Sequence, residues 1–275
     1  MTADLLPTSM QGALAMASGG QSPSGALCTR DLHKRFGGVS VLKGVELDVK
    51  EGQICAVLGQ NGAGKTTLLN ILTALVRPER GSVRIFGREV VGRHPWELSE
   101  LGVARTFQSP RLMLEDSCLD NVGLAAVSTR GSSRCSGVRA REAARMALDQ
   151  TGLAGVEGVV AGELPYGARR VLEIARCLVM RPRLLLLDEP AAGLSEGEEQ
   201  GLAELLIRLR DDGMTILLIE HRMHLVGSVA TRVVMLDSGR MIFDGTASEA
   251  LGSPVVRERY LGAGEVGRDV QQPDR

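Results

Sequence analysis

A glycine-rich segment between an apolar run and a helical pattern constrains this chain most. The run ICAVLG (54–59) is apolar and ends in glycine, which is the pattern of a strand buried in a parallel sheet. The stretch GKTTLLNILTAL (64–75) follows at once, with apolar residues at helical spacing. The sequence therefore predicts a strand, a tight loop and a helix in direct succession.

The loop GQNGAGKT (59–66) fits the phosphate-binding P-loop pattern of a glycine, four residues and Gly-Lys-Thr. Glycines let the backbone turn tightly and direct amides at phosphate oxygens, and the following helix adds its positive end. Lys65 is predicted to reach the β and γ phosphates of ATP, and the Thr66 hydroxyl to bind Mg²⁺. A chance match is the alternative, but the flanking strand and helix are the context that confirms the motif. The predicted nucleotide-binding residues are Gly59, Gln60, Asn61, Gly62, Ala63, Gly64, Lys65, Thr66 and Thr67.

An acidic pair follows a second apolar strand, LLLLDEP (184–190). In an open parallel sheet, ligands bind at the carboxyl ends of the strands. Asp188 is predicted to hold Mg²⁺ directly or through water, and Glu189 to orient and activate the attacking water. A solvated acid pair at a strand end is the alternative, and the P-loop in the same chain favours the functional interpretation.

Two further polar residues complete the predicted catalytic set with Lys65 and Glu189. His221 ends the apolar strand TILLIE, so we expect it at the same sheet edge as Glu189, near the γ-phosphate. Gln108, in ARTFQ, is predicted to sense the metal and the water. Without the other motifs, a surface histidine and a solvated glutamine would be the simpler interpretations.

Strands and helices alternate along the chain, which predicts a mainly parallel α/β sheet with a helical insertion at 116–162. The five cysteines are scattered, with no CxxC pair, as expected of reduced thiols in a cytosol. A net charge of −1 and 3% aromatic residues argue against nucleic acid as a partner. No apolar run approaches the roughly 18–20 residues that span a bilayer, so a membrane role must come through a partner. The predicted segments are a flexible extension (1–25), one ATPase domain (26–262) with a helical subdomain at about 110–180, and a flexible tail (263–275).

In their order along the chain, the motifs resemble the nucleotide-binding subunits of ABC transporters. These motifs are the P-loop, RTFQ, ELPYGARRVLEIAR, LLLLDEP, AAGL and IEH. The resemblance covers residues 27 to about 262, and RFGG, LPYG, DEPAAGL and LLIEHRM are most similar to the branched-chain amino-acid import branch. It implies a P-loop NTPase fold with a mainly parallel central sheet, an N-terminal antiparallel β subdomain and an α-helical insertion.

The resemblance also implies roles for matching positions. Phe36 takes the place of the aromatic residue that stacks on adenine, and His221 is the switch histidine. The segment LPYGA (164–168) stands at the signature motif, so Pro165, Tyr166 and Gly167 would complete the ATP site of the opposite subunit. The implied metal-site residues are Thr66, Gln108 and Asp188, with ATP and Mg²⁺ as cofactors.

Three residues depart from the family pattern. Pro165 replaces the signature serine, which removes a hydroxyl and an amide donor, although proline is favoured in the first turn of a helix. Arg169 stands where the import branch often has glutamine, and we expect it to provide extra positive charge. Ser195 replaces the usual aspartate of the interface loop.

The implied partners are a second ABC ATPase subunit, identical or different, transmembrane permease subunits and, indirectly, an extracytoplasmic solute-binding protein. The chain would then lie at the cytoplasmic face of the inner or plasma membrane. We expect the permease to dock near Gln108, on an exposed surface of Arg105, Phe107, Pro110, Leu112 and Met113. The alternatives are a motor for another small solute such as urea, a lipid-related export ATPase, a regulatory module with little hydrolysis, and a soluble ABC ATPase acting on ribosomes or nucleic acid.

Overall fold

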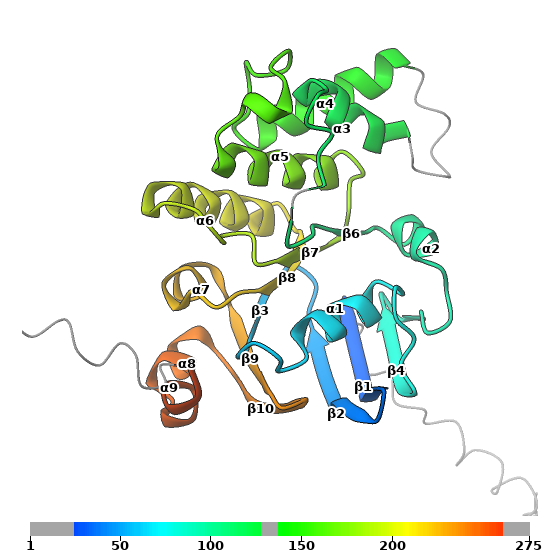
Figure 1. Ribbon diagram of the computed structural model, residues 1–275, viewed down its shortest axis with the longest axis vertical. Helices are drawn as coiled ribbons and strands as arrows, with labels where there is room; N and C mark the ends of the chain where they lie inside the picture. Colours follow the sequence, from blue (N-terminus) through cyan, green and yellow to red (C-terminus); the bar gives the residue numbers. More distant parts are fainter. Residues whose placement is uncertain (1–24, 110, 128–136, 261–275) are drawn as a thin grey trace, which may run out of the picture.

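The computed structural model describes residues 25–109, 111–127 and 137–260 of the 275-residue chain. Within these residues, two β-sheets and a group of helices form the fold (Figure 1). The flexible tail that we predict at 263–275 lies outside the described residues, as does the predicted flexible extension at 1–25 except for Gly25. None of the described helices is long and apolar enough to cross a membrane.

The six-stranded central sheet has the order β10-β9-β3-β8-β7-β6. All neighbouring strands are parallel except β9 and β10, which are antiparallel, so the prediction of a mainly parallel sheet is confirmed. Every residue of β3, β7 and β8 is buried, which explains why these strands are continuous apolar runs. The strand bounds are β3 (Ile54–Leu58), β6 (Val103–Arg105), β7 (Leu184–Asp188), β8 (Thr215–Ile219), β9 (Arg232–Asp237) and β10 (Arg240–Gly245).

The central sheet has a separate hydrophobic core on each face, because successive strand residues point to opposite sides. Ile54, Ala56 and Leu58 belong to the core shared with α5 (Tyr166–Leu178), α6 (Glu196–Asp211) and α7 (Met223–Val229). Cys55 and Val57 belong to the other core, which includes α1 (Lys65–Leu72) and the antiparallel sheet. The helices α1 and α5 therefore lie on opposite faces of the central sheet.

The N-terminal antiparallel sheet has the order β2-β1-β4-β5, as the family resemblance implies. The long strands β1 and β2 are joined by a turn at Gly37 and Gly38, both of which have positive φ angles. The bounds are β1 (Leu27–Phe36), β2 (Val39–Val49), β4 (Arg80–Ile85) and β5 (Arg88–Glu89), followed by helix α2 (Pro95–Glu100).

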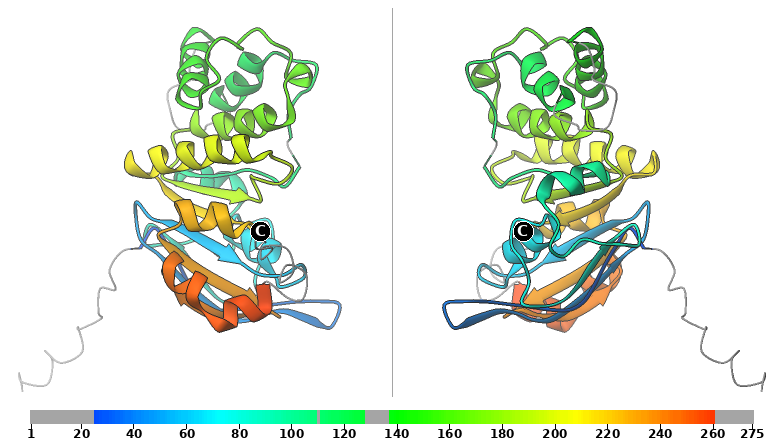
Figure 2. Two further views of the ribbon diagram at one scale, coloured as in Figure 1. Left: turned by 90° about the vertical axis from the view of Figure 1, so that its left-hand side faces the viewer. Right: turned by 90° about the vertical axis from the view of Figure 1, so that its right-hand side faces the viewer.

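The predicted helical insertion forms one end of the molecule (Figures 1 and 2). Buried residues of α3, α4 and α5, among them Val122, Ala144 and Leu172, join the same core. The bounds are α3 (Cys118–Val127), α4 (Gly137–Gln150) and the short 3₁₀ helix η1 (Ala161–Glu163) before α5. The C-terminal helices α8 (Ala247–Gly252) and α9 (Pro254–Tyr260) lie at the opposite end, beside β10.

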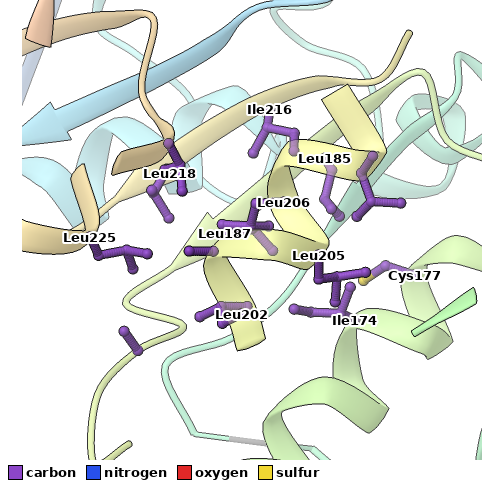
Figure 3. Close-up of a cluster of buried hydrophobic side chains, with 14 of the residues drawn as sticks. Ile174, Cys177, Leu185, Leu187, Leu202, Leu205, Leu206, Ile216, Leu218 and Leu225 are labelled. Carbon is purple, nitrogen blue, oxygen red and sulfur yellow. The ribbon is translucent and has the colours of Figure 1, made fainter. Parts of the chain in front are cut away.

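Helix α6 packs its apolar face on the central strands. Figure 3 shows Leu206 of this helix beside Leu187 of β7, and Leu205 beside Ile174 and Cys177 of α5. The helix begins at Ser195, whose side chain accepts a hydrogen bond from the Glu198 amide in a capping box. Ser195, one of the departures from the family pattern, is thus a helix cap in this chain.

Candidate nucleotide-binding and catalytic site

The predicted P-loop connects β3 to α1, with Gly64 as the N-cap of the helix. Gly59, Gly62 and Gly64 have positive φ angles of 154°, 82° and 108°, which residues with a Cβ rarely adopt. A Cβ on Gly59 would lie 2.3 Å from the Leu236 carbonyl oxygen, so the loop backbone presses against β9. The loop shape therefore requires glycine for both conformation and space.

Lys65 is hydrogen-bonded to the backbone of this loop. Its Nζ donates hydrogen bonds to the carbonyl oxygens of Gly59 (2.6 Å) and Gln60 (3.1 Å), and the residue is only 6% exposed. Burial lowers the pKa of Lys65, while the charges of Glu189 and Asp188 oppose this effect. The ammonium group thus lies inside the loop and within the field of the acidic pair.

The remaining P-loop residues differ in their exposure to solvent. Ala63 is buried and Thr67 is half-buried. Gln60, Asn61, Gly62 and Thr66 are exposed, so their polar groups are accessible from outside the chain. The Gln60 side-chain amide donates to the Arg259 carbonyl oxygen in α9, which ties the loop to the C-terminal helix.

Asp188 ends β7 and is buried, with 4% exposure. Its Oδ2 atom accepts a hydrogen bond from Nη2 of Arg105 at 3.0 Å, and its backbone amide donates to the Thr106 hydroxyl at 3.3 Å. Burial raises the pKa of Asp188, against the opposing effect of the Arg105 guanidinium. The predicted metal ligand is therefore a buried carboxylate with one oxygen engaged.

Glu189 brings the predicted catalytic side chains together. Gln108 Nε2 donates to Glu189 Oε2 at 3.3 Å, and His221 Nδ1 lies 4.0 Å from Oε1 of the same carboxylate. Glu189 has a φ of 47°, an unfavourable conformation for this residue type that often occurs at functional sites. Its amide donates to the Ile219 carbonyl of β8, which fixes the chain at this edge of the sheet.

Glu220 is a buried carboxylate that the sequence motifs do not single out. It is 0% exposed, and it accepts hydrogen bonds from the backbone amides of Ala191 (2.9 Å) and His221 (3.0 Å). Burial raises the pKa of Glu220, and the amide hydrogen bonds oppose this effect. Glu220 therefore joins the loop after Glu189 to the loop that carries His221.

The signature-like segment begins α5. Pro165 is the N-cap, one position before the first turn that we expected, with φ −54° and ψ 155°. Pro165 and Tyr166 are exposed, while Gly167 is buried. Hydrogen bonds from the backbone and hydroxyl of Ser195 and from the Gly167 backbone hold the pKa of Glu198 below its usual range. The start of α5 is thus packed on the start of α6.

Arg169 has hydrogen-bond partners within its own chain. Its guanidinium donates to the carbonyl oxygens of Leu164 (2.9 Å) and Gly162 (2.7 Å) in its own chain. Carbonyl groups that precede the helix satisfy these donors, so Arg169 stabilises the turn before α5. Phe36 lies at the end of β1 and is exposed, and the Lys34 ammonium lies 5.0 Å from the centroid of its ring.

A cavity of about 270 Å³ lies between the central sheet and the helical insertion. Helix α5 shapes it, because the Glu173 carboxylate accepts from the Phe107 amide (3.1 Å) and Arg170 donates to the Phe107 carbonyl (3.2 Å). The predicted exposed docking surface is wrong for Arg105, since its side chain is buried against Asp188. Pro110 lies outside the described residues. The cavity is lined by Arg105, Phe107, Arg111, Leu124, Ala125, Glu173, Arg176, Cys177 and Met180.

The fold and this site define a P-loop ATPase cassette, and comparison with known proteins agrees. The sequence profile of the ABC transporter family matches residues 42–192. The chain belongs to the ABC transporter family. It is an ATP-binding subunit of an ABC transporter that hydrolyses ATP.

Three curated relatives cover nearly the whole described chain. The high-affinity branched-chain amino acid transport ATP-binding protein BraF of Pseudomonas aeruginosa is 40% identical over 84% of this chain and 95% of its own length. The corresponding LivG proteins of Salmonella typhimurium and Escherichia coli are 37% and 36% identical, over 86% of this chain and 97% of theirs.

Solved structures agree with the fold. An ATP-binding cassette of an ABC transporter in its ADP conformation is 29% identical and covers 86% of this chain and 99% of its own, with a TM-score of 0.78. A dimeric cassette in a post-hydrolysis state, bound to ADP and Pi, is 25% identical over 80% of this chain and 98% of its own, with a TM-score of 0.72.

Proposed function

We propose that this chain is a motor subunit of an importer for branched-chain amino acids, attached to the cytoplasmic face of the membrane through permease subunits. The observation that carries the substrate class is the 36–40% identity to BraF and LivG proteins over nearly their whole length. The motifs LPYG and DEPAAGL, which resemble the same branch, support it.

The described residues fit Mg²⁺ and the phosphates of ATP. The glycine backbone of the P-loop and the N-terminus of α1 supply amide donors, and Lys65 supplies a positive charge beside them. The exposed Thr66 hydroxyl and the Asp188 carboxylate are oxygen ligands of the type that Mg²⁺ prefers, with Gln108 as a further oxygen donor. When bound, Mg²⁺ neutralises charge that develops on the phosphate oxygens. In this proposal Phe36 stacks on the adenine.

Hydrolysis would then be carried out by the group around Glu189. The Glu189 carboxylate orients the attacking water and accepts its proton, because it lies at the sheet edge beside the acidic end of β7. His221 and Gln108 both face this carboxylate, at 4.0 and 3.3 Å, and hold the water in line with the γ-phosphate. Positioning and electrostatics supply the rate, with no covalent intermediate.

The placement of α1 and α5 supports a nucleotide site shared between two subunits. The two helices lie on opposite faces of the central sheet, so the P-loop and the signature-like segment of one chain belong to different parts of the fold. A second ATPase subunit, arranged head to tail, would place its Pro165, Tyr166 and Gly167 against the γ-phosphate. The relative that forms a dimer bound to ADP and Pi supports pairing of two ATPase subunits.

The cavity beside α5 is the permease docking site in this proposal. Leu124 is 55% exposed at its rim, and the guanidinium of the exposed residue Arg111 lies 4.0 Å from the centroid of the Phe107 ring. An apolar rim with a cationic group suits a short permease helix that carries apolar and acidic residues. A solute-binding protein would contact the permease and not this chain.

Affinity capture from detergent-solubilised native membranes tests the proposal. The tagged chain should retain two multi-spanning permease proteins, and the purified complex should take up leucine into vesicles with ATP. Leu124→Arg, at the cavity rim, should lose the permeases, whereas Lys65→Ala should keep them and lose transport. Capture of ribosomal or nucleic-acid partners, or of no membrane protein, would contradict the transport proposal.

A further inference from the structure

The Arg105 side chain joins three parts of the fold at the acidic end of the site. Its Nη2 donates to Asp188 Oδ2 at 3.0 Å. Its Nη1 donates to the Asn70 Oδ1 (2.7 Å) and the Thr73 Oγ1 (3.2 Å) at the end of α1. One guanidinium therefore connects β6, β7 and the helix that follows the P-loop.

This ion pair is buried on both sides. The side chains of Arg105 and Asp188 are 8% and 6% exposed. A buried pair must be well hydrogen-bonded to offset the desolvation of two charges, and the planar guanidinium provides several donors in a fixed geometry. Because the Asn70 and Thr73 oxygens fix the guanidinium independently of Asp188, it acts as a rigid support for the carboxylate.

The contact also selects one oxygen of Asp188. Arg105 engages Oδ2, and the Thr106 hydroxyl accepts from the Asp188 amide, so side chain and backbone are both held by residues of the ARTFQ segment. The other carboxylate oxygen, Oδ1, is the one that Arg105 does not engage. A residue in this arrangement orients a metal ligand without touching the metal.

We infer that Arg105 is a positioning residue that holds Asp188 in the orientation required for Mg²⁺ binding with ATP. The inference rests on the proposed magnesium site at Thr66 and Asp188. Substitution of such outer partners typically weakens metal affinity about 10–100-fold. The metal-dependent part of ATP affinity should therefore depend on Arg105, while the part supplied by the P-loop and Lys65 should not.

Equilibrium binding of a fluorescent ATP analogue separates these two parts. In a Glu189→Gln background, Kd is measured with Mg²⁺ and with EDTA. Arg105→Gln should raise Kd about tenfold with Mg²⁺ and less than about twofold with EDTA. Asn70→Ala, which removes one support and keeps the ion pair, should raise the Mg²⁺ value severalfold. Arg232→Gln, which breaks an ion pair with Asp244 at the opposite end of the sheet, is the matched control and should change neither value.

Each outcome decides the inference. Equal weakening with Mg²⁺ and EDTA in Arg105→Gln would show a general structural effect and overturn it, as would tighter Mg²⁺-dependent binding. An unchanged Mg²⁺ value in Asn70→Ala would overturn it even if Arg105→Gln does not fold. If wild-type affinity does not depend on Mg²⁺, the proposed magnesium site fails as well. If Mg²⁺ strengthens ATP binding without the test substitutions, and neither Arg105→Gln nor Asn70→Ala changes Kd, only the role of Arg105 is overturned.

Discussion

Charged side chains with low exposure dominate the chemistry of this site. Lys65 and Asp188 are 6% and 4% exposed, and Glu220 is fully buried. Each of them makes hydrogen bonds that fix its direction. Charge interactions are stronger where water is excluded, so single substitutions here should have large and specific effects.

Lys65→Ala should weaken ATP binding by about 100-fold or more. The substitution removes a positive charge from the phosphate-binding loop and two hydrogen bonds to its backbone. Isothermal titration calorimetry with ATP measures the effect. Lys50→Ala, at an exposed position at the end of β2, is the control and should bind normally. Unchanged affinity in Lys65→Ala would refute the P-loop assignment.

Glu220 should make stability depend on pH in a defined direction. Its pKa in the folded protein is raised above that of the unfolded chain, so the folded state binds more protons between the two pKa values. Stability relative to Glu220→Gln should therefore rise as the pH falls through the folded pKa, and level off below the unfolded value.

Urea unfolding of wild type and Glu220→Gln at pH 7 and pH 5 measures this difference. Glu204→Gln, at an exposed position of α6, should show no such pH dependence. A wild type that loses stability relative to Glu220→Gln on acidification would contradict the assignment.

At the scale of elements, α6 fixes the central sheet to the helical insertion. Its apolar side packs on β7, while α5 packs on the same core from the insertion (Figure 3). Because β7 carries Asp188 at its end, this packing also fixes the acidic pair.

Leu206→Ala should destabilise the protein by about 2–5 kcal/mol, since Leu206 is 0% exposed and its removal leaves a cavity against β7. Chemical denaturation gives the change in the free energy of unfolding. Leu251→Ala, at a site of 46% exposure in α8, should stay within about 0.5 kcal/mol of wild type. Similar losses in the two variants would show that the α6 interface is not tightly packed.

The elements and the main motifs could be predicted from sequence because their signals are local. The strand at 54–58, the glycine loop and Lys65 adjoin one another, and the leucine run before Asp188 marks a doubly buried strand. The meeting of Glu189 and His221 follows from the rule that parallel strands end at one edge.

Other features depend on pairings that no local pattern encodes. The sequence leads us to expect Arg105 on a surface, because nothing in it shows that β6 lies beside β7 and near the end of α1. Arg169 bonds to carbonyls of the preceding turn, which its spacing alone does not indicate. Glu220 lies within the IEH motif, but its amide partners come from two different loops.

At the scale of the whole molecule, the P-loop of one subunit and the signature-like segment of a second subunit together form the proposed nucleotide site. Glu189→Gln should bind ATP and accumulate as an ATP-bound dimer, because slow hydrolysis removes the step that reopens it. Light scattering with ATP should give about twice 29.3 kDa, the mass of one chain. Lys65→Ala should remain monomeric. A monomer with ATP demonstrably bound would contradict the shared site.

Gly59 of the P-loop and Gly239, between β9 and β10, both lie too close to neighbouring backbone to accept a side chain. Added Cβ atoms on Gly59 and Gly239 would lie 2.3 Å from backbone oxygens of Leu236 and Val41. Alanine scanning normally removes atoms and reports what they contributed. At these two positions alanine adds a methyl group that would clash with the neighbouring backbone. A loss of activity there would therefore report a steric clash, and it should not be taken as evidence that the glycine takes part in binding or catalysis.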